Sequence, residues 1–285
     1  MTMKNFLNLP APAKLNLFLH IVGKRDDGMH LLQSVFQLVD LCDDIDLIEL
    51  SDGRIERDGD IDWPVEKDLC VRAARTLQQF CPEKGVRITV RKRIPNGAGM
   101  GGGSSDAATV LIGLNKLWNL NIPKQKLAEL AVSLGADVPF FIHGENAFVE
   151  GIGEIITPMD TPAFDYEIFL PEAKLSTADV FRTLNLTKPT KRCRMSDFSD
   201  CLKTFDIKPW GNNDLESVAR LLSADVDKMF LIPLLSGKVR MTGSGAAAFY
   251  AVKSDTRKTD WSSLPPSVRH WHVSSLQKHP LADWL

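Results

Sequence analysis

The segment that decides the fold runs Pro95-Asn96-Gly97-Ala98-Gly99-Met100-Gly101-Gly102-Gly103-Ser104-Ser105, with five glycines and two serine hydroxyls. Before it, Val86, Ile88 and Val90 alternate with polar residues, a pattern that indicates a half-buried strand. After it, residues 106–114 are mostly apolar and begin with a carboxylate, as at the start of a helix. Because glycine lets backbone N–H groups approach an anion and a helix start adds unpaired donors, the segment predicts a phosphate-binding loop.

A flexible linker and the common nucleotide-binding loops fit this segment less well. A linker would not normally lie between two strongly patterned elements. Gly97, Gly99 and Gly102 match the dinucleotide pattern G-x-G-x-x-G, but residues 107–128 contain no acidic residue to hold a ribose. A P-loop would need a lysine after Gly103, and the protein-kinase signatures are absent from the sequence. The loop is therefore predicted to hold phosphate in another way.

Polar residues elsewhere lie in apolar surroundings. Residues 13–21 alternate as a strand, and Lys14 and Asn16 fall on its mixed face, about 7 Å apart along the strand. Asp137 follows a predicted helix end and precedes the apolar residues 138–142, where a carboxylate is costly unless it is paired. These residues alone leave two interpretations open: a cleft that pairs Lys14 with Asp137, or a turn aspartate and an edge-strand lysine that reaches solvent.

Motifs in a fixed order connect these residues to a known family. They are the loop with Asp106-Ala107-Ala108 after it, Pro12-Ala13-Lys14-Leu15-Asn16-Leu17, Gly28-Met29-His30, Gly135-Ala136-Asp137-Val138-Pro139-Phe140 and Met241-Thr242-Gly243-Ser244-Gly245. With these motifs the chain resembles the superfamily of galactokinase, homoserine kinase, mevalonate kinase and phosphomevalonate kinase. The resemblance spans residues 12–252, and the end of the chain beyond it carries no motif.

The resemblance implies an α+β, two-domain small-molecule kinase. The N-terminal domain would be like domain 2 of ribosomal protein S5 and the C-terminal domain ferredoxin-like, with ATP and substrate between them. We place the boundary in residues 157–162, which contain two prolines. This gives an ATP-loop and catalytic domain at 1–158 and a substrate-side domain at 159–285. The irregular mixture of strand and helix patterns also favours α+β over regular alternation.

The resemblance also implies ATP and Mg²⁺ as cofactors. The whole loop from Pro95 to Ser105 would hold ATP. Asp137 would take the proton of an alcohol substrate, while Lys14 would keep that carboxylate ionised and steady the transferred phosphoryl group. No residue is assigned as a direct metal ligand: Ser105 is a candidate, but water and phosphate oxygens can supply most of the coordination.

Within the superfamily, the motifs are most similar to those of a kinase of isoprenoid-precursor synthesis, whose small-molecule substrate carries a cytidine diphosphate group. By this resemblance Asn16, His30 and Asp137 contact the substrate, and Phe181, with Thr177 one turn before it, stacks on the cytosine. Met29 stands where the family usually has tyrosine, on the opposite face of that base. The alternatives are a sister kinase, such as homoserine or mevalonate kinase, and a non-catalytic nucleotide-binding protein.

The composition is that of an ordinary globular protein. The 285 residues are 44% hydrophobic and 25% charged with a net charge of −2, which implies no general electrostatic attraction to nucleic acid or an anionic membrane. Five widely spaced cysteines, none in a C-x-x-C pair, predict neither a disulfide framework nor a zinc site. No apolar run approaches the length of a membrane span. We therefore expect a cytoplasmic enzyme, a monomer or weak homodimer, without nucleic-acid or membrane partners.

Two further clusters are interpreted as surface features. His270 and His272 would share one face of a strand but have no third metal ligand nearby in sequence, so we interpret them as surface histidines. A basic run suits a solvated loop, or a rim near a phosphorylated ligand, better than a nucleic-acid patch. It comprises Lys188, Lys191, Arg192 and Arg194.

The remaining hydrophobic patterns predict the other elements. Strands are expected at 31–41, 148–156 and 166–170, helices at 68–80, 123–134 and 213–224, a polar hairpin at 43–61, and a strand, Gly-Ser-Gly turn and second element at 239–250.

Overall fold

The computed structural model describes residues 5–60, 63–173, 175–184, 188–199, 211–237, 239–252 and 260–285, and they form a mixed α+β fold around one connected sheet. Its main path is β3-β4-β2-β10-β7-β9-β8, while β1 pairs with β2, and β5 pairs with β2 and β6. The strands are β1 (Asn5–Lys24), β2 (His30–Leu50), β3 (Ile55–Gly59), β4 (Gly85–Arg91), β5 (Ala147–Gly151), β6 (Ile155–Pro158), β7 (Asp165–Pro171), β8 (Arg240–Met241), β9 (Ala248–Val252) and β10 (Val268–Leu276). The predicted fold class is confirmed.

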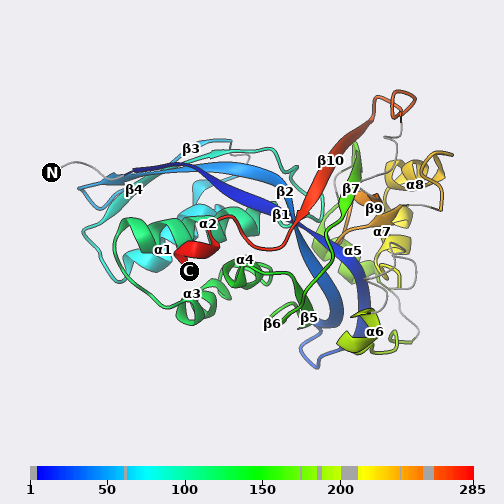
Figure 1. Cartoon of the computed structure of the whole chain (residues 1–285), viewed down its shortest axis with the longest axis horizontal. Coiled ribbons are helices and arrows are strands. Elements are labelled where there is room, and N and C mark those ends of the chain that lie inside the picture. Colours follow the sequence, from blue (N-terminus) through cyan, green and yellow to red (C-terminus); the bar gives the residue numbers. More distant parts are fainter. Residues whose placement is uncertain are drawn as a thin grey trace.

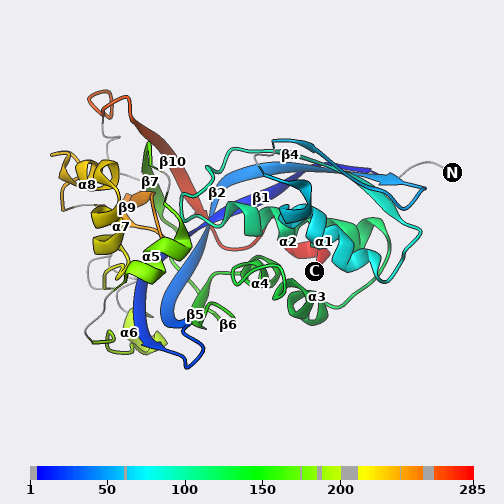
Figure 2. The same cartoon turned by 180° about the vertical axis from the view of Figure 1, so that it is seen from behind.

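Helices gather at both ends of this sheet. The described helices are α1 (Leu69–Gln78), α2 (Gly102–Leu117), α3 (Lys124–Ala131), α4 (Val138–His143), α5 (Thr177–Thr183), α6 (Met195–Ser199), α7 (Glu216–Leu222) and α8 (Ala224–Leu231). Figures 1 and 2 show α1 to α4 on one side of β1, β2 and β4, and α5, α7 and α8 around β7 and β9 at the other end. The predicted helices at 68–80 and 123–134 are confirmed.

The long strands β1 and β2 connect the two ends. They form an antiparallel hairpin from Asn5↔Ile48 to Lys24↔His30, with register shifts near Pro12 and after Asn16. Every residue from Ala11 to Ile21 is buried, so the mixed face of β1 is covered as well as its apolar face. Polar side chains on that face therefore point into the protein.

Three predicted elements differ from the structure. Residues 43–61 are not a hairpin, because the alternating apolar strand β4 inserts between β2 and β3 and pairs in parallel with β3. Residues 148–156 divide into β5 and β6 around a turn at Gly151 and Gly153. Residues 213–224 end earlier as α7, because Ser223 leaves the helical conformation and caps α8 instead.

The end of the chain, which carries no motif, joins the two ends of the fold. Strand β10 pairs with the whole of β7, and its last two residues pair with β2 at Ser275↔Val39 and Leu276↔Leu38. The chain then reaches the helices of the first half, where the Trp284 and Phe6 rings lie 4.7 Å apart. The division at residue 158 stays a prediction.

The surface predictions are partly corrected. All four residues of the basic run are exposed. His270 and His272 share one face as expected; His272 is exposed, His270 is half-buried, and both contact the buried carboxylate of Glu167. Among the described residues, no cluster of three or more His, Cys, Asp or Glu side chains could hold a metal ion, and no helix is long and apolar enough to cross a membrane. Four cysteines are free thiols, and Cys201 lies outside the described residues.

His279 anchors the C-terminal segment and predicts a pH-dependent stability. The backbone N–H of His279 donates to the Gly144 carbonyl at 2.7 Å, and its buried ring nitrogen Nδ1 accepts from the Leu281 N–H at 3.0 Å. Burial lowers the pKa of His279 from 6.5 to about 4. As pH falls below 6.5, His279 takes up a proton in the unfolded chain but not in the folded protein. The free energy of unfolding therefore decreases as pH drops from 6.5 to about 4.

We expect the wild-type protein to lose about 2 kcal/mol more stability than His279→Gln between about pH 7.5 and about pH 5. Urea unfolding at the two pH values measures this difference. Equal losses in the two proteins would show that His279 stays neutral on unfolding or protonates without cost.

Candidate active site

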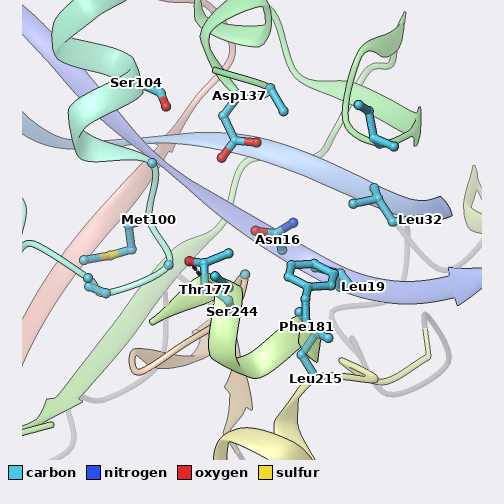
Figure 3. Close-up of a pocket in the computed structure, with 18 of the residues that line it drawn as sticks. Asn16, Leu19, Leu32, Met100, Ser104, Asp137, Thr177, Phe181, Leu215 and Ser244 are labelled. Atoms are coloured by element: carbon cyan, nitrogen blue, oxygen red, sulfur yellow. Dashed lines mark hydrogen bonds between the residues drawn. The ribbon is translucent and has the colours of Figure 1, made fainter. Parts of the chain in front are cut away.

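A cavity of about 950 Å³ lies between the glycine-rich loop, β1, α5 and the turn after β8 (Figure 3). It brings together residues that are distant in sequence. Of the predicted site residues, its lining includes Lys14, Asn16, Met29, His30, Asp137, Thr177, Phe181 and the loop from Pro95 to Ser104. Ser105 is the exception, because its side chain is fully buried in α2 and does not line the cavity.

Lys14 and Asp137 meet at the centre of the cavity wall. Lys14 Nζ lies 3.5 Å from Asp137 Oδ2, donates to Asn16 Oδ1 and stands 4.3 Å from the centre of the Phe36 ring. Burial lowers the pKa of Lys14, and the charge of Asp137 opposes that shift. Asp137 makes no side-chain capping bond to α4, and its carboxylate points into the cavity. The structure thus brings the two side chains together in one cavity, as the first of the two interpretations expects, and their catalytic roles stay a prediction.

Asn16 is fixed by a network that the sequence did not reveal. Its Nδ2 donates to Ser34 Oγ at 3.0 Å, and its backbone N–H donates to Thr242 Oγ1 at 2.9 Å. Because Nδ2 is committed to Ser34, the amide oxygen must face Lys14. Thr242 belongs to the Met241–Gly245 motif, which was a signal for its position, whereas Ser34 had none.

The glycine-rich loop and the Gly243–Gly245 turn interlock through their backbones. A Cβ on Gly99 would lie 2.2 Å from the Thr242 carbonyl oxygen, and one on Gly243 would lie 2.6 Å from the Gly99 oxygen. Ala246 N–H donates to the Gly97 carbonyl at 3.2 Å. The second glycine turn therefore supports the first one, in addition to lining the cavity through Gly243 and Ser244.

The far end of the cavity holds two flat rings. The His30 and Phe181 ring centres are 5.5 Å apart, and burial with the charge of Lys24 lowers the pKa of His30. Met29 beside them is 49% exposed. Thr177 Oγ1 lies 2.8 Å from Ser244 Oγ, which ties α5 to the second glycine turn. Four leucines that were not predicted as site residues also line the cavity: Leu19, Leu32, Leu184 and Leu215.

None of the four residues of the basic run lines the cavity. Arg192 instead lies 3.6 Å from Glu150 on β5. All four are exposed, which fits the solvated loop better than the rim.

Comparison with known proteins gives the family. A model of the N-terminal domain of GHMP kinases matches residues 68–145. A relative from Thiobacillus denitrificans, named 4-diphosphocytidyl-2-C-methyl-D-erythritol kinase, is 44% identical over 97% of this chain and 98% of its own. The chain belongs to the 4-diphosphocytidyl-2-C-methyl-D-erythritol kinase family. A relative of the same name from Delftia acidovorans is 45% identical over 99% of this chain and 98% of its own.

Solved structures agree with membership in this kinase family. A crystal structure of 4-(cytidine 5'-diphospho)-2C-methyl-D-erythritol kinase has a TM-score of 0.77 and 30% identity, covering 95% of this chain and 99% of that one. Homoserine kinase from Cytophaga hutchinsonii has a TM-score of 0.66 at 17% identity, with 90% and 87% covered, which shows the shared fold alone.

The interlocked glycines predict a sharp difference within one loop. Gly99→Ala would place a Cβ against a carbonyl oxygen at a φ of +76°, whereas the Cβ of Gly103→Ala finds only Leu69 Cδ1 at 3.8 Å. We expect Gly99→Ala to cost about 2–4 kcal/mol of unfolding free energy. Gly103→Ala, near the start of α2, should be neutral or stabilise by up to about 1 kcal/mol. Urea denaturation of the two variants compares them, and equal stabilities would contradict the interlock.

Proposed function

We propose that this protein transfers the γ-phosphoryl group of ATP to the 2-hydroxyl of 4-diphosphocytidyl-2-C-methyl-D-erythritol, a step of the non-mevalonate route to isoprenoid precursors. The observation that carries the proposal is the Lys14–Asp137 pair, 3.5 Å apart, between the glycine-rich loop and the His30–Phe181 end of one cavity. The names of the relatives supply the substrate. The described residues of one chain line the cavity on several sides, which suits an active monomer or weak homodimer. We place this enzyme in the cytoplasm.

The ATP phosphates occupy the loop from Pro95 to Ser104. Gly101 adopts a φ of +73° as the residue that precedes α2, and the unpaired N–H groups of that helix start favour an anion. A Cβ on Gly101 would lie 3.1 Å from the Phe141 ring and 3.2 Å from Lys14 Cγ. Only glycine therefore leaves the backbone accessible between these neighbours.

Mg²⁺ fits the donors beside this loop. The Ser104 hydroxyl and the Asp137 carboxylate both face the cavity, and hard oxygen donors with phosphate and water oxygens suit this ion (Figure 3). Bound there, Mg²⁺ would neutralise phosphate charge during transfer. Ser105 does not supply a ligand in this arrangement, because its hydroxyl is buried away from the cavity.

Asp137 accepts the proton of the attacking hydroxyl. Its side chain is 32% exposed while Lys14 is only 4% exposed, so the carboxylate reaches the substrate and the ammonium supports it from behind. The positive charge favours the ionised carboxylate and stabilises negative charge that develops on the phosphoryl oxygens. The link to Asn16 and the Phe36 ring holds the ammonium in place.

The cytosine lies at the end of the cavity that holds the His30 and Phe181 rings. Phe181 stacks on the base, His30 contacts its polar edge, and Met29 covers the face where the family usually has tyrosine. Asn16 and Thr177 contact the rest of the substrate. A panel of alcohols with detection of ADP separates this assignment from a sister kinase, and absence of any turnover would indicate a non-catalytic nucleotide-binding protein.

Asp137→Asn tests the proton acceptor. The amide has the same shape but cannot take a proton, so kcat should fall by about 10²–10⁴-fold while ATP affinity stays near wild type. Steady-state kinetics and ATP titration calorimetry measure the two quantities. Asp225→Asn, which changes an exposed carboxylate on α8 paired with Lys228, is the control and should leave kcat unchanged. An Asp137→Asn enzyme with more than about half of the wild-type kcat would remove Asp137 from the mechanism.

Phe181→Ala tests the base-stacking end. Loss of one base–aromatic stack should cost about 1–3 kcal/mol, or roughly 5- to 150-fold in substrate affinity. Met29→Tyr should be tolerated, since Met29 is half exposed and a tyrosine ring can cover the same face. Titration calorimetry with the cytidine substrate measures both, with Phe80→Ala at an exposed remote phenylalanine as the control. Normal binding by Phe181→Ala together with loss of binding in Met29→Tyr would place the cytosine elsewhere.

A further inference from the structure

A buried ionic cluster lies directly behind the glycine-rich loop. Lys92 Nζ pairs with Asp106 Oδ2 at 2.7 Å and also with Asp43 Oδ2. The side chain of Asp43 is fully buried, and those of Lys92 and Asp106 are 13% and 6% exposed. None of the three lines the cavity, so the cluster takes no direct part in the site described above.

The cluster connects the two ends of the loop. Lys92 follows the last residue of β4, and Asp106 comes directly after Ser105 on α2. Their ion pair therefore joins the two ends of the loop. Asp43 on β2 accepts hydrogen bonds from the backbone N–H groups of Arg93 at 2.5 Å and Ile94 at 2.8 Å. Through these contacts both ends of the loop are fixed to the same point of the sheet.

Lys92 also lies beneath the first residue of α2. A Cβ on Gly102 would come within 3.3 Å of Lys92 Nζ and 2.9 Å of Ile94 Cγ2. The backbone that carries the first N–H groups of α2 therefore rests on the ammonium group and its neighbour. Any movement of Lys92 changes where those donors point.

Stability alone does not account for this cluster. Burying one cation with two carboxylates is costly, and apolar residues of similar volume often do as well or better. Burial and the nearby charge of Asp43 raise the pKa of Asp106 to about 7, although Lys92 opposes the shift. Asp106 Oδ1 also has no hydrogen-bond partner among the described residues. The arrangement is better explained by the position that it imposes on the loop.

We propose that Lys92, held between Asp43 and Asp106, is a positioning residue that fixes the separation of the two loop ends and thereby sets the affinity of the loop for ATP. The inference rests on the proposed function of the loop. It adds residues to the ATP side of the reaction without placing them in contact with substrate or nucleotide.

Asp106 is the residue to change, because Lys92 and Asp43 then remain as a neutral pair. Asp106→Ala removes the ion pair with Lys92. Asp106→Leu removes it as well but fills the space with a branched apolar side chain. Asp106→Asn keeps an oxygen that can accept from Lys92 Nζ. The matched control is Asp44→Ala, which breaks the neighbouring but solvent-facing pair of Asp44 with Arg93.

We expect Asp106→Ala and Asp106→Leu to raise the KM and Kd for ATP by about 10-fold, because small misplacements of binding groups are expensive. The KM for the cytidine substrate should stay near wild type, and Asp106→Asn and Asp44→Ala should bind ATP within about 2-fold of wild type. Asp106→Leu should keep or raise the unfolding midpoint, since it replaces a buried charge. Weaker ATP binding in a protein of equal or greater stability is a result that a merely structural role would not give.

The experiment measures steady-state kinetics for both substrates, ATP titration calorimetry and urea unfolding on all variants. ATP affinity unchanged in Asp106→Leu, or equal loss of affinity for both substrates, would overturn the inference. If Asp106→Ala does not fold, Asp106→Leu carries the same test. A wild-type enzyme that turns over ATP beside unaffected variants contradicts only the positioning role, whereas a wild-type protein without ATP turnover contradicts the proposed function itself.

Discussion

The close backbone contact between Gly99 and Gly243 is the constraint on which the cavity depends. Neither residue has room for a side chain, because each Cβ would overlap the other segment's backbone. This contact joins the loop before α2 to the turn after β8, which are far apart in sequence. It sets the distance between the wall at which we propose that ATP binds and the wall proposed for the second substrate.

A buried lysine lies on either side of that loop. On the cavity side, Lys14 is held by Asp137, Asn16 and the Phe36 ring. On the core side, Lys92 is held by Asp43 and Asp106. A lysine that is removed from water needs partners of this kind, since an isolated buried charge is too costly. The loop lies between two cations whose positions are fixed, and an anion bound there meets charge that is already oriented.

Much of the site was predictable because its signals are local. The glycine-rich loop shows in the sequence because its backbone conformation and close contacts admit almost no other residue. Lys14 and Asn16 were visible because polar side chains in an otherwise apolar, alternating strand are costly to bury without partners. The predictions that were wrong also have physical reasons. Residues 43–61 resemble a hairpin, and only the insertion of β4 as their neighbour decides otherwise. The helix at 213–224 was extended too far because Ser223 can continue a helix or cap the next one.

The sequence by itself determined the loop, the strand and helix on either side of it, the polar residues that line the cavity and, through its motifs, the kinase family. These follow from backbone conformation, side-chain period and residue chemistry, which act over a few neighbours. The tertiary structure alone decided that Asp137 pairs with Lys14, that Ser104 and not Ser105 faces the cavity, and that β10 joins both ends of the sheet. It also decided that Lys92 reaches Asp106 and Asp43 behind the loop. Such pairings depend on which buried groups meet when the chain packs, and no local pattern records that.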